Sequence, residues 1–185
     1  QHPKKPVGIF YKTLEEAKKN NPNSTIIEDA GRGYRKVVPS PKPIDFLGIE
    51  SIKKNVESGS IVIVGGGGGI PTIIKDGKYI GVDGVIDKDF ALSKIASSVD
   101  ANIFLILTAV EHIYVNWGKP NQKALITTNV KELEKYIEEG QFAAGSMLPK
   151  VEAAIEFVKS GKNRVAIIAD LSKVEEALEG KSGTK

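Results

Sequence analysis

The sequence contains no cysteine and only two histidines, His2 and His112, which lie far apart. Without thiols there can be no disulfide framework and no thiolate nucleophile, a pattern typical of cytoplasmic proteins. Two distant imidazoles argue against a zinc site. No apolar run approaches the length of a membrane span, and no secretory signal is visible. We therefore expect a cytoplasmic protein with no resident metal and no membrane partner.

Methionine and excess charge are also scarce. The chain opens at Gln1, and its one methionine is Met147, so we expect a piece of a longer protein. The net charge is only +3, and residues 1–47 hold nine basic against five acidic side chains, so the surplus lies in the first quarter. A basic segment can bind nucleic acid, but no aromatic stacking pattern or recognition helix accompanies this one. We therefore expect the basic segment to bind anionic small molecules rather than nucleic acid.

The chain is long enough for one α/β domain with a small appendage, since 41% of its 185 residues are hydrophobic. Residues 1–47 are rich in turn formers but retain apolar anchors, which predicts a small protruding subdomain. Thr13 is expected to cap a short helix there, with Glu16 completing a capping box. Residues 48–185 form the predicted α/β domain.

From residue 48 the hydrophobic pattern becomes regular. Stripes of apolar residues with helical spacing alternate with short apolar runs that are typical of buried strands. Asp76-Gly77 lies between two short apolar runs and predicts a hairpin. The other predicted elements are helices at 49–58, 92–99, 130–137, 151–158 and 174–178, and strands at 61–64, 103–107 and 165–169. This alternation predicts an α/β fold with an open, largely parallel sheet and helices on both faces.

Five consecutive glycines, residues 65–69, follow the apolar run 61–64. A buried strand that ends in glycines marks the edge where parallel sheets bind ligands, and glycine lets backbone N–H groups approach phosphate oxygens. A flexible turn is the alternative. The dinucleotide fingerprint fails, because its third glycine would fall on Ile70 or Pro71, and no Gly-Lys-Ser/Thr follows for a P-loop. The run is therefore a phosphate-loop candidate of neither standard type.

Two further segments carry lysines at predicted helix starts. Asp87 is well placed as an N-cap and Asp89 favours the helix dipole, but Lys88 gains nothing from that position. Lys88 either neutralises phosphate charge or is a solvated surface lysine. In residues 145–150, Ser146 is a candidate cap and Pro149 fits a first turn, so Lys150 belongs either to an anion site or to an ordinary capped helix.

Taken together, the motifs resemble carbamate kinases, which belong to the amino-acid kinase fold. The resemblance extends over essentially the whole chain. The matching segments are residues 5–8 (KPVG), 31–43 (GRGYRKVVPSPKP), 65–71 (GGGGGIP), 85–89 (VIDKD), 142–151 (FAAGSMLPKV) and 180–184 (GKSGT). It implies a homodimeric enzyme that interconverts ATP plus carbamate with ADP plus carbamoyl phosphate, using Mg²⁺. In many microbes this is the last step of arginine deiminase fermentation.

The resemblance also implies roles for individual residues. Lys88 would bridge the transferring phosphoryl group, Asp89 would orient the lysines, and Lys150 would neutralise nucleotide phosphates. Lys5, on the protruding subdomain, would close over the carbamoyl side. The implied nucleotide-binding residues are Gly65, Gly66, Gly67, Gly68, Thr108, Ala109, Val110, Met147 and Lys150. Many amino-acid kinases carry Asp where this chain has Ala109, which weakens the nucleoside assignment there.

The resemblance is incomplete at the front. Carbamate kinases begin with a strand and a Gly-Gly-Asn-Ala-Leu loop that help to bind carbamate, and this chain carries neither. We therefore expect the carboxyl-terminal three-fifths of such an enzyme, which alone would fold poorly or self-associate and would not make ATP. The alternative is a catalytically silent module that binds nucleotides or other proteins. Another amino-acid kinase, such as one acting on acetylglutamate, is disfavoured by residues 39–41 and their basic flank.

Overall fold

The computed structural model describes residues 3, 5–29 and 31–185, so His2 lies outside the described residues. The chain divides into two compact units. The first comprises the residues up to Pro43 together with Gly65–Lys88, and the second comprises Ile44–Val64 together with Asp89–Lys185. The sequence-based division at residues 47 and 48 cuts the chain once, whereas each unit is built from two separate segments.

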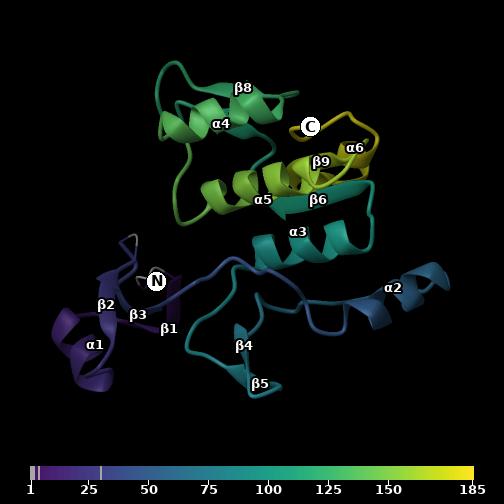
Figure 1. Cartoon of the computed structure of the whole chain (residues 1–185). Coiled ribbons are helices and arrows are strands. Elements are labelled where there is room, and N and C mark those ends of the chain that lie inside the picture. Colours follow the sequence, from purple (N-terminus) through teal and green to yellow (C-terminus); the bar gives the residue numbers. More distant parts are fainter. Residues whose placement is uncertain (1–2, 4, 30) are drawn as a thin grey trace. The chain divides into compact units, whose positions relative to one another are not determined.

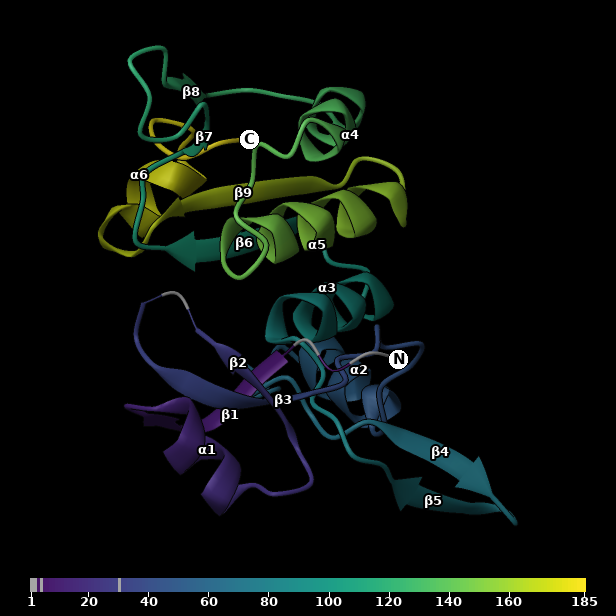
Figure 2. The same cartoon turned by 90° about the vertical axis from the view of Figure 1, so that its left-hand side faces the viewer.

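A three-stranded antiparallel sheet and one helix form the amino-terminal part of the first unit (Figure 2). The strands are β1 (Lys5–Tyr11), β2 (Thr25–Glu28) and β3 (Tyr34–Val38), in the order β1-β3-β2, and the helix is α1 (Leu14–Asn20). Thr13 caps α1 as predicted, since its hydroxyl accepts a hydrogen bond from the Glu16 N–H at 3.2 Å. Ala17 of α1 and Val37 of β3 are almost fully buried and form the centre of this small core.

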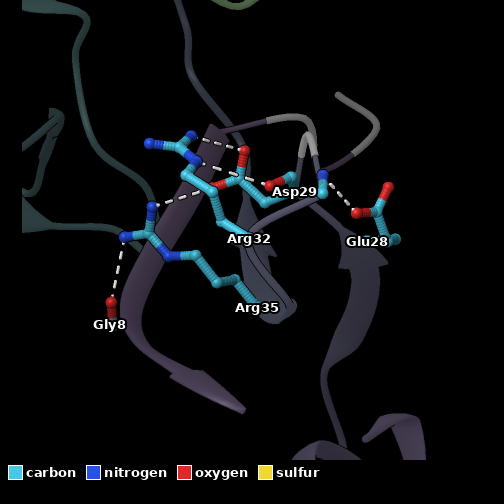
Figure 3. Close-up of polar contacts among 6 residues, drawn as sticks. Gly8, Glu28, Asp29, Arg32 and Arg35 are labelled. Atoms are coloured by element: carbon cyan, nitrogen blue, oxygen red, sulfur yellow. Dashed lines mark hydrogen bonds and ion pairs between the residues drawn. The ribbon is translucent and has the colours of Figure 1, made fainter. Parts of the chain in front are cut away.

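Asp29, just after β2, is held by two arginines (Figure 3). Arg32 donates to one carboxylate oxygen at 2.9 Å and Arg35 to the other at 3.0 Å. Arg35 also donates to the Gly8 carbonyl of β1 at 2.9 Å and lies 4.5 Å from the centre of the Phe10 ring. Burial raises the pKa of Asp29, but the hydrogen bonds from the two arginines outweigh it and leave the pKa below its ordinary value of 3.8. Two of the basic side chains in this quarter thus share one internal carboxylate, which offsets one of their two positive charges.

The predicted hairpin at Asp76-Gly77 is confirmed. Strands β4 (Thr72–Lys75) and β5 (Lys78–Gly81) pair antiparallel, with Lys75 opposite Lys78. Both turn residues have positive φ, 52° at Asp76 and 70° at Gly77. This is the type I′ geometry that an Asp-Gly pair favours.

The second unit is built around two parallel strands, β6 (Ile103–Thr108) and β9 (Val165–Asp170), which pair from Ile103 with Val165 to Thr108 with Asp170. Helix α5 (Met147–Lys159) packs on one face of this pair, as Figure 1 shows. Ala177 of α6 (Val174–Leu178) packs on the other, against Ile167 and Ala169. Alternate side chains of β9 therefore enter opposite cores, as expected for a strand buried on both faces.

The larger core of the second unit gathers side chains from α3, α4, α5 and both parallel strands. Phe157 of α5 is fully buried and its ring lies 5.3 Å from that of Phe104 on β6. Ser93 of α3 donates to the Ala153 carbonyl at 2.9 Å, which fixes α3 against α5. The remaining elements of this unit are α2 (Ile49–Glu57), α3 (Lys88–Ser98, whose first residue belongs to the first unit), β7 (Ile113–Val115), β8 (Lys123–Leu125), α4 (Val130–Glu138) and a 3₁₀ turn at Leu171–Lys173.

The residues near the carboxyl terminus complete the sheet on the free side of β9. Thr184 is 3% exposed and forms an antiparallel bridge with Ile168. Its hydroxyl accepts from the Ile113 N–H at 2.8 Å and donates to the Leu125 carbonyl. Gly183 has φ 81°, and a Cβ there would come within 2.9 Å of the Ala169 side chain. The segment 180–184, which carries part of the family resemblance, thus connects β9 with β7 and β8 through Thr184.

Two predictions about the sheet are corrected. Only β6 and β9 pair in parallel among the described residues, and the other sheets are small and antiparallel, so one large parallel sheet is not observed. The predicted buried strand 61–64 is wrong: these residues are in no strand, and Ile61 and Ile63 are each 97% exposed. A β-branched run becomes a strand only when a neighbouring strand accepts its backbone hydrogen bonds, and no described strand does so here.

Helix α2, in the same segment as the run 61–64, has the predicted apolar stripe but no buried residue. Val56 of the stripe is 43% exposed, and Ile44 and Leu47 before the helix are 89% and 55% exposed. The segment from Ile44 to Val64 therefore presents an uncovered apolar surface. Among the described residues, no helix is long and apolar enough to cross a membrane.

Candidate functional site

The glycine loop, residues 65–69, lies in the first unit and is shaped by its glycines. Gly65, Gly66 and Gly69 have φ of 91°, 57° and 90°, a region in which side chains other than glycine are strained. A Cβ on Gly68 would overlap the Ile86 carbonyl oxygen, so the loop lies directly against the backbone of residue 86. The Ile86 N–H donates to the Gly69 carbonyl at 3.1 Å. The loop is thus packed against residue 86 and hydrogen-bonded to it.

Lys5 and Asp87 form an ion pair within the same unit. The Lys5 ammonium donates to Oδ2 of Asp87, whose side chain is 11% exposed, while that of Lys5 is 37% exposed. Asp87 immediately precedes the first residue of α3, the position at which a cap was predicted. The structure adds the contact with Lys5 of β1, which sequence analysis did not foresee.

Lys88, the first residue of α3, is exposed, whereas its neighbours Asp87 and Asp89 are both 8% exposed. A cation in the first turn of a helix is unfavourable, because the unpaired N–H groups there already carry partial positive charge. Both alternatives for Lys88, a phosphate contact or a solvated lysine, fit its exposure.

Asp89 and Lys150 form a second ion pair, in the second unit. The Lys150 ammonium donates to Oδ2 of Asp89 at 2.9 Å, and the two side chains are 15% and 11% exposed. Lys150 stands in the first turn of α5, where backbone N–H groups and a lysine together favour an anion. Ser146 occupies the cap position of α5 as predicted, but its side chain makes no capping hydrogen bond.

An open pocket of about 340 Å³ lies beside Lys150 in the second unit. Four residues that the resemblance assigned to the nucleotide, Thr108, Val110, Met147 and Lys150, line it together. Ala109 is exposed and is not among the lining residues. The pocket is mostly apolar with one cationic end, which suits a flat base at one side and a phosphate at the other.

The aromatic wall of this pocket was not predicted from the sequence. Tyr114 and Trp117 line it with ring centres 5.1 Å apart, and Trp117 is 60% exposed. Gln141, which also lines it, accepts a hydrogen bond from the Asn116 N–H at 2.9 Å and so ties the loop after β7 to the residues before α5. The signal available in the sequence was the rarity of tryptophan, since this chain has only one.

A polar cluster follows the carboxyl ends of the parallel strands. Glu111 accepts hydrogen bonds from Lys173 and Ser182, both at 2.9 Å. The hydrogen bond from Lys173, helped by that from Ser182, lowers the pKa of Glu111 below its ordinary value of 4.5 despite the opposing effect of burial. The Glu111 hydrogen bond raises the pKa of Lys173 above 10.5. This cluster joins the end of β6 to the chain after β9.

Neither unit offers a ready metal cage. In the described part of the chain, no three His, Cys, Asp or Glu side chains are gathered as they would be around an ion. Mg²⁺ with a nucleotide usually needs only one or two carboxylates, because phosphate oxygens and waters complete its octahedron. The residues present are therefore compatible with Mg²⁺ that arrives on the nucleotide, with Asp87 and Asp89 as the carboxylates nearest the candidate lysines in sequence.

Comparison with protein families matches residues 7–169 to the amino acid kinase family. The chain belongs to that family. The predicted resemblance to carbamate kinases is confirmed: the chain is 58% identical over its whole length to a carbamate kinase-like protein of Mycoplasma pneumoniae and 57% identical to the carbamate kinase of Clostridium perfringens. It covers 60% and 59% of these two relatives, so it spans about three-fifths of their length.

Solved structures of this family agree. Carbamate kinase from Giardia lamblia bound to AMP-PNP superposes with a TM-score of 0.84 at 43% identity, over 98% of this chain and 58% of that one. The same enzyme bound to citric acid gives a TM-score of 0.88 at 41% identity. The α/β fold of this chain therefore matches carbamate kinase structures over the part of them that it covers, and one of these structures holds an ATP analogue.

Proposed function

We propose that this chain is the nucleotide-binding part of a carbamate kinase, which interconverts ATP plus carbamate with ADP plus carbamoyl phosphate. The observation that carries the proposal is the pocket beside Lys150, since four residues expected at the nucleotide converge there in a chain 57% identical to a carbamate kinase. By family resemblance, the reaction serves arginine deiminase fermentation in the cytoplasm and the active form is a homodimer.

The base of the nucleotide would occupy the apolar pocket, with Thr108, Val110 and Met147 around it. Lys150 would neutralise phosphate charge, and Asp89 would hold the Lys150 ammonium in place. Phosphoryl transfer requires positioning and charge stabilisation more than covalent chemistry, and fixed ammonium groups with backbone N–H donors provide both. Mg²⁺ bound to the phosphates would offset further negative charge.

Lys88 would bridge the transferring phosphoryl group, and Lys5 would close over the carbamoyl side. The glycine loop, Gly65 to Gly68 above all, would lie near the phosphates with its backbone donors. The alternative, a silent nucleotide-binding module, shares the pocket but does not require Lys88.

Replacement of Lys88 by alanine separates these two functions. In the longest polypeptide that carries this sequence, Lys88→Ala should lower the rate of ATP formation on the order of 10²–10³-fold, because the charge acts chiefly in the transition state. ADP affinity, measured by calorimetry, should change little. Lys78→Ala removes an exposed lysine of β5 in the same unit and is the matched control. Equal turnover in the two variants would show that Lys88 is a solvated surface lysine without a role in catalysis.

A further inference from the structure

The tripeptide Asp87-Lys88-Asp89 pairs each of its aspartates with a lysine distant in sequence. Asp87 accepts a hydrogen bond from Lys5, and Asp89 accepts one from Lys150. Lys5, Lys88 and Lys150 are the three lysines for which we propose roles in phosphoryl transfer. The family resemblance gave an orienting role to Asp89 and none to Asp87.

We propose that Asp87 is a positioning residue that fixes the ammonium group of Lys5 beside the glycine loop. The proposal rests on the proposed carbamate kinase function. It assigns to Asp87, for Lys5, the task that Asp89 performs for Lys150.

The backbone around Asp87 is anchored on two sides. The Val85 N–H donates to the Pro39 carbonyl at 3.0 Å, at the end of β3, and Ile86 is bonded to Gly69. Gly84 lies so close to Pro39 that a Cβ would come within 2.9 Å of its carbonyl oxygen. The segment carrying Asp87 is therefore fixed against both the glycine loop and the three-stranded sheet.

The Lys5 side chain needs such a fixed partner. It is a flexible four-carbon stem with a point charge, and it loses rotamer freedom when it is held in one place. The Asp87 carboxylate is nearly buried, and a buried carboxylate is stable only when it is paired or hydrogen-bonded. An ammonium group has three donors, so Lys5 can contact Asp87 and still offer donors to a phosphoryl oxygen.

Lys5 itself sits at a structurally defined point, the first residue of β1. Lys5 pairs with Val38 in the β1–β3 ladder, one residue before Pro39. Val38 of β3 thus sets the strand register that places Lys5, and the adjoining Pro39 supplies the carbonyl that holds the segment of Asp87. Loss of the Asp87 charge would free the ammonium without removing either backbone anchor.

The test is a double-mutant cycle of Asp87→Asn and Lys5→Met in the longest polypeptide that carries this sequence, assayed for ATP formation from carbamoyl phosphate and ADP. Asp87→Asn should lower kcat/KM for carbamoyl phosphate by about 10- to 100-fold, as expected when a catalytic group is misplaced by about 1 Å. The ADP dissociation constant should change less than about twofold, since Lys5 is proposed for the carbamoyl side. In the Lys5→Met background, Asp87→Asn should have little further effect.

Asp83→Asn is the matched control, because Asp83 is an exposed aspartate four residues before Asp87 in the same segment. It should leave all of these constants unchanged. If Asp87→Asn behaves like Asp83→Asn, or if the Asp87 and Lys5 effects multiply independently, the positioning role is wrong while the proposed function stands. If the unmutated polypeptide makes no ATP, the proposed function fails and this inference fails with it. Equal urea midpoints for the two Asn variants would show that a kinetic loss is not one of folding.

Discussion

The contact between the glycine loop and the backbone of residue 86 predicts different effects of alanine at two neighbouring positions, Gly67 and Gly68. Alanine at Gly68 would put a methyl group into the Ile86 carbonyl oxygen and within 3.2 Å of the Asp87 carbonyl carbon. Both obstacles are backbone, so no side-chain rotation can relieve the overlap. Alanine at Gly67 meets nothing within 4 Å, and Gly67 does not have positive φ. The same substitution should therefore be disruptive at Gly68 and nearly neutral at Gly67.

The magnitude follows from what must move. Forcing a methyl group into a packed site costs about 1–3 kcal/mol, and separating the loop from residue 86 also breaks the Ile86–Gly69 hydrogen bond, worth about 1 kcal/mol. Together these amount to about 2–4 kcal/mol, or about 30- to 1,000-fold in an equilibrium constant. Gly68→Ala should lose that factor in ADP affinity if the loop moves, or in folding stability if it keeps its place.

Two measurements on each variant decide the matter: the ADP dissociation constant by calorimetry and the urea midpoint by circular dichroism. Gly67→Ala should match the unmutated chain in both within about 0.5 kcal/mol, the usual range for an unstrained surface change. Gly66→Ala should fall between the two variants, because φ of 57° costs a side chain about 1–2 kcal/mol without any clash. If Gly68→Ala matched Gly67→Ala in both affinity and stability, the inferred packing of the loop against residue 86 would be refuted.

Three further outcomes are expected. Lys150→Met should weaken ADP binding by about tenfold or more, since a charge-assisted hydrogen bond contributes about 1.5–3 kcal/mol; an unchanged dissociation constant would remove Lys150 from the site. Because the pKa of Glu111 is lowered in the folded protein, its ionised form stabilises the fold above pH 4.5, and this contribution is lost as pH falls through the lower folded pKa. The urea midpoint of Glu111→Gln should accordingly fall less on acidification than that of the unmutated protein, and identical pH profiles would contradict the role of the Glu111–Lys173 pair. Replacing Ile61 and Ile63 together by lysine should reduce self-association of residues 1–185 measured by light scattering, because both side chains are almost fully exposed, and equal scattering would disprove an apolar contact there.

Local patterns predicted most of the secondary structure. The apolar stripes on α3, α4 and α5, the strands β6 and β9, and the Asp76-Gly77 turn depend on residues close in sequence, and all are observed. The run 61–64 failed because a strand depends on a partner, and partnering is not encoded within four residues. Ser146 is the predicted N-cap of α5 but lacks a capping hydrogen bond, because its φ of −142° and ψ of −73° differ from the extended backbone of a capping residue, and local composition does not fix these angles.

Single residues of the candidate site could be predicted from the sequence, but the contacts between residues distant in sequence could not. Lysines at helix starts were visible in the sequence, but nothing local linked Lys5 with Asp87, which are separated by 82 positions. Tyr114 and Trp117 have no periodic signal, because Tyr114 lies in the three-residue strand β7 and Trp117 lies in the turn that follows it. Pairings of this kind follow from the packing of distant segments and become visible only in three dimensions.

The most direct test of the central claim follows ATP formed from carbamoyl phosphate and ADP, with Mg²⁺, by the longest polypeptide that carries this sequence. Luciferase detection in the presence and absence of carbamoyl phosphate isolates the transferred group, and calorimetry on the same sample measures ADP binding. We expect ATP formation that requires both substrates. ADP binding without any ATP formation would contradict it and would identify a silent nucleotide-binding module.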